Sequence, residues 1–501
     1  MPNRSVINRW IGAVSAVVVA GLPARPIYSQ ASASLFASAA TTTARVYNGG
    51  GAGHAPPKVR VSVDWDTALG HRLSPALYGL NLYRAPDKKS VVDGTYAANL
   101  AYMGPRLVRI HNGGIMQASG SHWEGLLNEK RHTWDIAKVL GMVAAIRRAL
   151  PEADIVFNVP GWPAWMDRDG DGFLDADEQD NYAGLLADLV RIVNREGKLG
   201  VRYWEITNEM DGRYWTDFYQ NGGYGPLKDE ARPDRMPELI GIYNRCATAM
   251  KQVDPSIRTG GPAAARSDLQ AMHEAFITGT LPHLDFFSIH AYASGSAADP
   301  DSKVFDTADT IARYAERTTA LMHRHSPARE IPVILGEYNV SWDWQTRDER
   351  MVNNKGAVFD ALILVQAARS GIFSAQSWND KDNIYGKTDD SDRRRPGAEL
   401  LHLFNSFLTG IPAQARSSDD SSVVAFAVSE PRKNRRSLLL INRTDTAQPI
   451  ALEFPGGIPV PRRVAVYRID AAGSTEATWP MAIGIERTRI LPPDSVTLLV
   501  F

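Results

Sequence analysis

Hydrophobic and polar positions follow two different patterns along the chain, and the first extends to about residue 410. In this part, short apolar runs of strand length alternate with segments whose apolar residues recur every three or four positions, as on one face of a helix. Eight such runs with intervening helices predict an α/β fold, a closed (β/α)8 TIM barrel rather than an open sheet. The expected strands are 76–81, 106–111, 154–159, 201–209, 257–262, 284–290, 331–337 and 372–378, and the expected helices include 134–150, 181–196, 237–253, 307–325 and 397–408.

The second pattern begins at residue 411, where short segments alternate apolar and polar residues between Pro, Gly and Asn turns. A period of two is typical of strands that are buried on one face. We therefore predict a C-terminal β-sandwich over 411–501 beside a barrel over 76–410. The segment 58–75 begins with the same alternation but precedes the barrel, and it is expected to add a strand to this accessory sheet.

The first 57 residues follow neither pattern. Arg4 and Arg9 precede an apolar run over 10–22, and small residues follow it, as in a secretory signal peptide. We predict a signal peptide over 1–33 and a flexible leader rich in Ala, Ser, Thr and Gly over 34–57, so the protein is expected to be secreted or periplasmic. The apolar run is short for a membrane span, and an uncleaved N-terminal anchor is the alternative.

The composition is that of an ordinary soluble globular protein, with 44% hydrophobic and 22% charged residues. A formal net charge of -1 gives no reason to expect nucleic acid or an anionic membrane surface as a partner. The single cysteine, Cys246, excludes an intrachain disulfide and is interpreted as a small buried hydrophobic residue of a helix. Composition leaves the oligomeric state open.

Two of the predicted strands end on a glutamate. The run VRYWEITNE ends on Glu209, and IPVILGE ends on Glu337. The carboxyl ends of barrel strands form the active-site face of (β/α)8 enzymes. A retaining glycosidase needs a carboxylic acid that protonates the leaving oxygen and a carboxylate that attacks the anomeric carbon, about 5 to 5.5 Å apart. We therefore predict that Glu209 and Glu337 meet at the barrel mouth as a catalytic pair.

The segments around these glutamates resemble the retaining hydrolases of the large (β/α)8 clan that carry the acid/base on strand four and the nucleophile on strand seven. Within this clan the sequence is most similar to glycoside hydrolase family 39, the β-xylosidase and α-iduronidase group. The resemblance implies that Glu209 is the acid/base and Glu337 the nucleophile in the hydrolysis of a β-linked oligo- or polysaccharide. Met210 and Gly336 depart from the family pattern, which leaves the sugar open. The matching segments are VRIHNGG, WEITNE followed by MDGRYW, DFFSIHAY and GEYNVSW, and they span strands two to eight.

The resemblance also assigns contacts to residues beside the glutamates. Asn208 is implied to bind the hydroxyl next to the anomeric carbon, and Arg109 to pair with Glu337 and keep it ionised. The alternative for Arg109 is an ion pair at the barrel floor. Glu205 points the same way as Glu209 by strand alternation but lies deeper, so we interpret it as structural.

Histidine and aromatic residues at other strand ends are further candidates for sugar contacts. His290 and Tyr292, at the end of strand six, are implied to orient the nucleophile and the sugar, and Trp378, at the end of strand eight, to offer a stacking platform. A core histidine and plain packing are the alternatives for His290 and Trp378. His111 and Trp162, at the ends of strands two and three, are additional subsite candidates.

A second motif is independent of the barrel pattern. The segment DRDGDGFLDADE, residues 167–178, fits the calcium loop D-x-D-x-D-G-x5-E at every required position, with Gly172 at the turn. Because the loop follows strand three, we expect a structural Ca²⁺ that stiffens the active-site rim; a solvated acidic turn is the alternative. The expected ligands are Asp167, Asp169, Asp171, the Phe173 carbonyl, Asp175 and Glu178.

Two other functions are compatible with these residues. One is an endo-acting hydrolase of an exopolysaccharide that uses the same glutamates, and the length of the loop 221–236 is expected to discriminate exo from endo action. The other is a non-catalytic, calcium-dependent carbohydrate-binding protein on the same barrel. The presence of both Glu209 and Glu337 argues against this second alternative, because a binding protein has no physical need for either.

Overall fold

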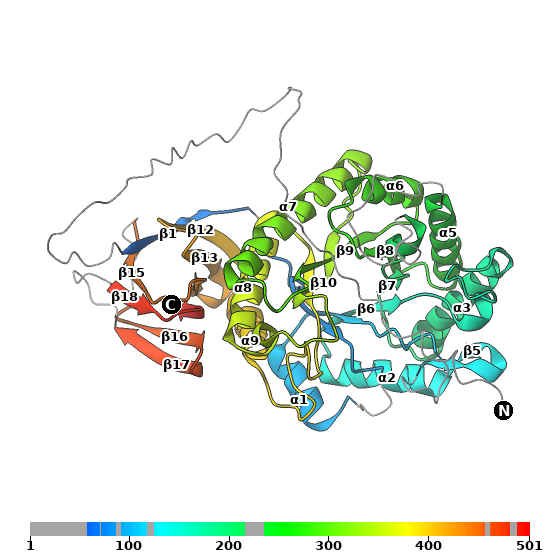
Figure 1. Cartoon of the computed structure of the whole chain (residues 1–501), viewed down its shortest axis with the longest axis horizontal. Coiled ribbons are helices and arrows are strands. Elements are labelled where there is room, and N and C mark those ends of the chain that lie inside the picture. The colour runs from blue at the N-terminus through cyan, green and yellow to red at the C-terminus, as the bar shows by residue number, and fades with distance from the viewer. Residues whose placement is uncertain are drawn as a thin grey trace.

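The computed structural model describes residues 58–70, 72–86, 92–117, 125–215, 235–455, 461–480 and 488–501. The predicted signal peptide and leader, and nearly all of the loop 221–236, lie outside these residues. The chain forms a helix-covered barrel and a β-sheet domain that lie side by side (Figure 1). Among the described residues, no helix is both long and apolar enough to cross a membrane.

Eight parallel strands close the barrel in the order β10-β11-β2-β3-β6-β7-β8-β9. Each of the eight strands expected from the sequence is present, and the predicted (β/α)8 barrel is confirmed. The strands are β2 (Tyr78–Leu82), β3 (Leu107–Ile110), β6 (Asp154–Val159), β7 (Tyr203–Ile206), β8 (Arg258–Ala264), β9 (Phe286–Ser294), β10 (Val333–Ser341) and β11 (Ser374–Ser377).

Helices surround the barrel, and their positions between the strands follow the expected alternation (Figure 1). Six residues in a π-helical conformation, Arg191–Glu196, extend one of them, and Cys246 is buried in another. A two-stranded ribbon, β4 (Leu127–Asn128) and β5 (Thr133–Trp134), lies between β3 and the second helix in the chain. The helices are α1 (Gly94–Met103), α2 (Ile136–Ala149), α3 (Gln179–Val190), α4 (Asp211–Tyr214), α5 (Met236–Val253), α6 (Gln270–Thr280), α7 (Asp301–His325), α8 (Asn354–Ser370) and α9 (Pro396–Phe407).

The helix α8 joins the two domains. The Asn353 side chain caps its N-terminus by accepting from the Lys355 N–H at 2.8 Å, and Gly371, with a φ of 71°, ends it in the left-handed conformation. The residues from Gly356 to Val365 are all buried, and apart from Asp360, which pairs with Lys387, they are apolar. A helix of this kind must be covered on every side. The helix α8 contacts strands of both domains, and Figure 1 shows it between the barrel strands and the β-sheet domain.

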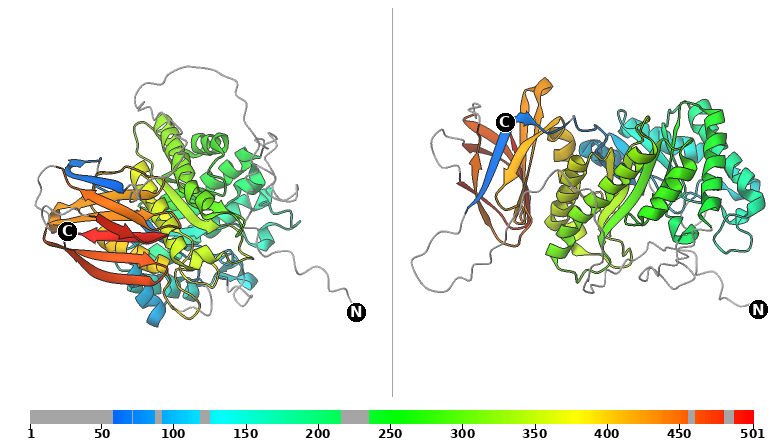
Figure 2. Two further views of the ribbon diagram at one scale, coloured as in Figure 1. Left: turned by 60° about the vertical axis from the view of Figure 1, so that its left-hand side comes forward. Right: turned by 90° about the horizontal axis from the view of Figure 1, so that it is seen from above.

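The C-terminal domain is one nine-stranded sheet with the order β17-β16-β19-β14-β13-β12-β1-β15-β18. The strand β1, from before the barrel, pairs antiparallel with β12 and parallel with β15. The sheet curls, and the hydrogen bonding runs through it without the break that separates two layers of a sandwich (Figure 2). Its strands are β1 (Val59–Ala68), β12 (Ile411–Ser417), β13 (Val423–Glu430), β14 (Arg435–Asn442), β15 (Gln448–Glu453), β16 (Arg463–Asp470), β17 (Gly473–Pro480), β18 (Thr488–Leu491) and β19 (Ser495–Val500).

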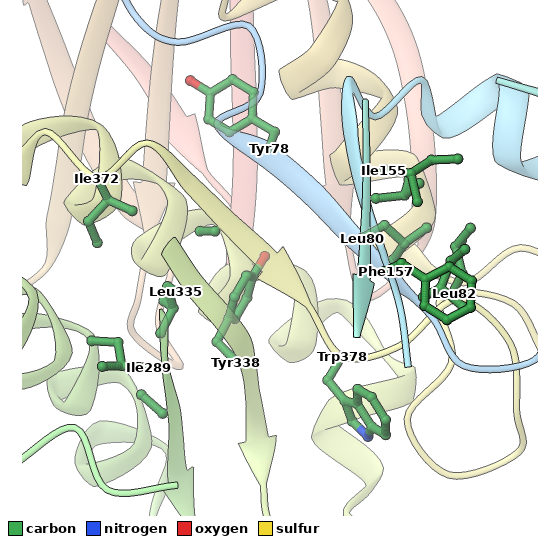
Figure 3. Close-up of a cluster of buried hydrophobic side chains, with 14 of the residues drawn as sticks. Tyr78, Leu80, Leu82, Ile155, Phe157, Ile289, Leu335, Tyr338, Ile372 and Trp378 are labelled. Atoms are coloured by element: carbon green, nitrogen blue, oxygen red, sulfur yellow. The ribbon is translucent and has the colours of Figure 1, made fainter. Parts of the chain in front are cut away.

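Strand alternation in the sheet domain separates two of the hydrophobic clusters. In β13, Val424, Phe426 and Val428 face the cluster that continues into the helices and the barrel, whereas Val423 and Ala425 face a second cluster inside the curled sheet. Figure 3 shows the barrel part of the first cluster, in which apolar side chains from several strands lie together. This first cluster is continuous from the barrel to the sheet domain. It holds in place the barrel strands whose ends carry the polar residues of the candidate site.

Candidate active site

Two glutamates meet at the carboxyl ends of the barrel strands. Glu209 lies three residues beyond the end of β7, and Glu337 lies within β10, with β8 and β9 between these strands. One carboxylate oxygen of each lies within 4.8 Å of the other and of a ring nitrogen of His290. Retaining glycosidases place their two carboxyl groups about 5 to 5.5 Å apart, against roughly 6.5 to 9.5 Å in inverting enzymes. A separation of this size is nearer to the retaining than to the inverting spacing.

The chain leaves β7 in an unusual conformation before it reaches Glu209. The expectation of a strand through residue 209 is wrong, because β7 ends at Ile206. Thr207 and Glu209 have φ angles of 68° and 54°, in the left-handed region that side chains with a Cβ rarely adopt. The Glu209 N–H donates to the Ala263 carbonyl at 2.9 Å. Such backbone persists only where the surroundings hold it, and it is common at functional sites.

Two donors hold the carboxylate of Glu337. Arg109 donates from Nη1 to Oε1 at 2.8 Å, and the Tyr292 hydroxyl donates to Oε2 at 2.5 Å. The Glu337 side chain is only 5% exposed. A cation and a hydroxyl on separate oxygens fix the orientation of the carboxylate. This environment suits a carboxylate that acts as a nucleophile.

The surroundings of Glu209 favour its protonated form. Burial raises the pKa of Glu209 from 4.5 to about 7, and the charge of Arg109 opposes this rise only in part. Its Oε1 lies 2.8 Å from Nδ1 of His290. Burial also lowers the pKa of His290, which favours a neutral imidazole. Glu209 can therefore hold a proton near neutral pH, as a general acid must.

The register of β9 and β10 brings His290 beside the nucleophile. Glu337 is paired with His290 across the two strands, and the register shifts at Gly336. A Cβ at Gly336 would lie 3.2 Å from Nε2 of His290. The glycine that departs from the family pattern thus permits this close approach of the imidazole.

Arg109 is the centre of the buried polar network. Besides Glu337, it contacts Oε2 of Glu205 through Nε at 2.6 Å, Oδ1 of Asn81 through Nη1 at 3.0 Å, and Oδ1 of Asn208 through Nη2 at 2.6 Å. The guanidinium is 0% exposed. The nucleophile contact and the floor ion pair considered from the sequence are therefore both present. Glu205 acts as the structural partner of Arg109, since it does not reach the barrel mouth.

Asn208 presents its amide nitrogen to the barrel mouth. Its Oδ1 accepts from Arg109, and among the described residues Nδ2 has no hydrogen-bond partner. The side chain is partly exposed. It can therefore donate to a substrate hydroxyl beside Glu209.

His111 lies on the other side of Glu337. Its Nδ1 is 2.7 Å from Oδ1 of Asn158, whose amide nitrogen donates to Glu205 at 2.8 Å. The Asn158 oxygen must accept, so the proton of His111 lies on Nδ1. Burial lowers the pKa of His111 well below its usual value, which leaves a neutral ring. Its Nε2 lies 4.0 Å from Glu337 Oε1 and, without a proton of its own, can accept a hydrogen bond from a substrate hydroxyl.

The two tryptophans occupy different surroundings. The ring of Trp378 lies 5.5 Å from that of His111 and 5.2 Å from that of Tyr83, and it is 7% exposed. Trp378 thus lies beside the site residue His111, and neighbouring side chains cover most of it. Trp162 lies edge-on to Tyr182 at 6.0 Å and to Tyr214 at 6.2 Å, and none of its ring contacts in the described residues is with the residues around Glu337.

Two asparagines of this network were missed from the sequence. Asn81 and Asn158 are 0% exposed and hold the side chains of Arg109 and His111. Their signal is a single amide inside an apolar strand, in GLNLY and DIVFNV. An amide buried in a strand must find partners, so it marks a polar network.

The predicted calcium loop is partly assembled. Oxygens of Asp167, Asp169 and Asp175 lie within 4.8 Å of one another. Asp171 instead accepts from the Phe173 N–H at 2.8 Å, and Glu178 accepts from Asn181 Nδ2 at 2.9 Å. The carboxylates of Asp171 and Glu178 lie outside the three-aspartate group.

Comparisons with known proteins match this architecture. The model of glycosyl hydrolases family 39 matches residues 178–390, which include both glutamates but not Arg109. A β-xylosidase of Caldicellulosiruptor saccharolyticus is 28% identical over 165 residues, 32% of this chain and 30% of the relative. An intracellular exo-α-(1->5)-L-arabinofuranosidase of Streptomyces lividans is 23% identical over 214 residues, 38% of this chain and 30% of the relative. The matched segment thus spans under a third of each of these relatives.

Solved structures share the fold at low sequence identity. The family 39 enzyme of Xanthomonas axonopodis pv. citri has a TM-score of 0.64 at 16% identity, covering 89% of this chain and 97% of that one. A monomeric β-xylosidase of Caulobacter crescentus CB15 has a TM-score of 0.61 at 14% identity, covering 88% and 98%. The chain is therefore similar to the retaining (β/α)8 glycoside hydrolases, and within them to family 39.

Proposed function

We propose that this protein hydrolyses β-glycosidic bonds with retention of configuration. The observation that carries the proposal is the pair of carboxylates within 4.8 Å of each other in unlike surroundings. Burial raises the pKa of Glu209 to about 7, whereas Glu337 accepts from Arg109 and Tyr292. An acid that keeps its proton near pH 7, beside a carboxylate held by a cation and a hydroxyl, has the division of labour that a retaining glycosidase needs.

In the first step, Glu337 attacks the anomeric carbon while Glu209 gives its proton to the glycosidic oxygen. The bond between the anomeric carbon and this oxygen breaks, the aglycone leaves as an alcohol, and an ester joins the sugar to Glu337. In the second step the ionised Glu209 removes a proton from water, whose oxygen displaces Glu337. Arg109 and Tyr292 stabilise the carboxylate that is released.

The substrate class proposed is a β-xyloside or a related β-linked oligo- or polysaccharide. It is supported by the names of the relatives, among which are two β-xylosidases. The amide of Asn208 beside the acid would bind the neighbouring hydroxyl of the sugar. We also propose export, which is supported by Arg4, Arg9 and the apolar run that follows them.

The test is hydrolysis of a panel of 4-nitrophenyl and 2,4-dinitrophenyl glycosides and of xylan by the full chain. The native protein is compared with Glu209→Ala and Glu337→Ala, and with Glu316→Ala as a control on the exposed face of α7. Loss of Glu209 is expected to slow substrates with poor leaving groups by about 10² to 10⁴-fold. Loss of Glu337 is expected to abolish turnover, with the control unchanged.

Two outcomes overturn the proposal. Turnover that survives Glu337→Ala contradicts the assigned nucleophile. Binding of a glycan without turnover by the native protein replaces the hydrolase with a carbohydrate-binding protein. Internal cleavage of a polysaccharide, without release of terminal sugar, keeps the chemistry but shows endo action.

A further inference from the structure

The segment from Asp167 to Glu178 is strongly acidic and lies between β6 and α3. Its twelve residues hold six carboxylates and one arginine. Such a concentration of negative charge is unfavourable without a counter-charge. Hydrolysis by Glu209 and Glu337 uses none of these side chains, so it does not account for their presence.

We propose that this loop binds one calcium ion through the carboxylates of Asp167, Asp169 and Asp175, and that the ion fixes the loop against the chain that follows Glu209. The three carboxylate oxygens lie within 4.8 Å of one another. Calcium binds oxygens at about 2.3 to 2.6 Å, so two ligands of one ion are at most roughly 5 Å apart. The observed cluster fits this limit.

The buried carboxylate of Asp167 is an independent sign of a cation. Asp167 is 8% exposed, and its Oδ1 atom has no hydrogen-bond partner in the described part of the chain. Its other oxygen accepts from the Gly172 N–H at 3.1 Å. A buried carboxylate oxygen without a partner is costly and therefore rare in native proteins. A cation shared with Asp169 and Asp175 would supply the missing partner.

The single arginine of the loop is a weak competitor for the ion. Arg168 contacts Asp175 at 2.6 Å, Asp177 at 2.5 Å and Glu178 at 3.5 Å, and its side chain is 55% exposed. Ion pairs made by an exposed arginine contribute little to stability. A divalent cation can therefore displace Arg168 from Asp175 and leave it paired with Asp177.

The ligand type and the backbone favour calcium over magnesium. The cluster offers only oxygen ligands, on a loop whose Gly172 has a φ of 88° and turns the chain sharply. Calcium accepts six to eight oxygens in flexible geometry, whereas magnesium demands near-ideal octahedral geometry and keeps its waters. Asp171, the Phe173 carbonyl and Glu178 are close in sequence and would complete the shell.

Contacts with α4 connect the loop to the active site. The ring of Phe173 lies edge-on to that of Tyr214 at 4.9 Å, and the Leu174 N–H donates to the Tyr214 hydroxyl at 3.4 Å. Arg213 donates to the Asp171 carbonyl at 3.3 Å. Because α4 begins two residues after Glu209, an ion that orders the loop also stabilises the segment that carries the proposed acid.

The test is terbium luminescence and calcium titration of the full chain after treatment with a chelator. Terbium has the ligand preference of calcium and is excited through nearby aromatic rings. One saturable site, from which calcium but not equimolar magnesium displaces terbium, is expected. Asp169→Asn, at an exposed side chain, is expected to weaken binding by on the order of tenfold or more because one ligand charge is lost.

Asp177→Asn is the matched control, because Asp177 is 67% exposed, belongs to the same loop and lies outside the cluster. Its affinity is expected to change far less than that of Asp169→Asn, because Asp177 contacts Arg168 and not the ion. Chelation is expected to lower the melting temperature of the native protein and of Asp177→Asn, but not that of Asp169→Asn. Absence of a saturable site, or equal affinity in Asp169→Asn and the native protein, overturns the proposal. Neither readout depends on glycosidase activity.

Discussion

Replacement of Glu209 by glutamine is predicted to stabilise the fold at alkaline pH while it removes the proposed acid. The native carboxylate is 16% exposed, and burial raises its pKa from 4.5 to about 7. Folding therefore disfavours the ionised form of this group. Glutamine keeps the shape and an oxygen that can accept from His290, but it carries no charge to bury.

The size and sign of the effect follow from the pKa. Below pH 4.5 Glu209 is protonated in both the folded and the unfolded chain. In this range its contribution to the free energy of unfolding therefore does not change with pH. From pH 4.5 to 7 the unfolded chain loses this proton first, and stability falls as pH rises. Above pH 7 the cost is complete, and at 1.36 kcal/mol per unit it amounts to about 3 kcal/mol.

Urea unfolding followed by tryptophan fluorescence at pH 4 and pH 8 measures this difference. We compare the free energy of unfolding of Glu209→Gln with that of the native protein at each pH. The difference in favour of Glu209→Gln is expected to be about 3 kcal/mol larger at pH 8 than at pH 4. Glu316→Gln, at an exposed position of α7, is the control and is expected to show no such pH dependence. A Glu209→Gln difference that is the same at both pH values would refute the reasoning, because it would mean that the buried charge costs nothing.

Three further predictions concern the same network. First, kcat/KM on substrates with poor leaving groups is expected to fall as pH rises through about 7, where Glu209 loses its proton, and pH profiles with a 2,4-dinitrophenyl glycoside should lack this limb. Second, Tyr292→Phe removes the 2.5 Å bond to Glu337 and is expected to lower kcat about 10- to 100-fold, since hydrogen bonds to charged groups contribute about 1.5 to 3 kcal/mol; an unchanged kcat in steady-state assays contradicts this. Third, Arg109→Met leaves Glu205 and Glu337 without their cationic partner. It is expected to lower the free energy of unfolding, measured in urea, by about 3 to 5 kcal/mol. Addition of Glu205→Gln should restore part of that loss, and a further additive loss would count against the buried pair.

The barrel could be predicted from the sequence because its strands are buried on both faces. Runs such as DIVFNV and LDFFSIH are mostly apolar and are separated by long helical segments, so the number and order of the strands could be predicted. Strand ends were harder to predict. The run to Glu209 looks like one strand, and nothing in its apolar pattern reveals that Thr207 turns into the left-handed region.

In the C-terminal domain, the strands that bury one face could be predicted and the edge strands could not. The strand β17, Gly473–Pro480, is exposed at nearly every position, so it carries no alternation of apolar and polar residues. The strand β18, Thr488–Leu491, is short and pairs at the opposite edge of the sheet. Whether the hydrogen bonding continues through the whole curled sheet depends on which distant strands pair. The alternation of apolar and polar residues along the chain does not show this pairing.

The candidate site could be predicted in so far as Glu209 and Glu337 lie near the carboxyl ends of barrel strands, which brings them together. It was not predictable where buried amides orient those residues. Asn158 orients His111 and Glu205, and Asn81 contacts Arg109, but each contact joins residues far apart in sequence. Spacing along the chain does not encode such contacts.

The anomeric configuration of azide adducts tests the paired roles of the two glutamates most directly. Glu209→Ala and Glu337→Ala are each incubated with azide and the 2,4-dinitrophenyl β-glycoside that the native protein hydrolyses best, and the products are analysed by NMR. Azide that attacks the glycosyl-enzyme in Glu209→Ala should yield the β-glycosyl azide, and azide that replaces the nucleophile in Glu337→Ala should yield the α-glycosyl azide. The opposite assignment, or the same anomer from both variants, would contradict a retaining mechanism with Glu209 as acid/base and Glu337 as nucleophile.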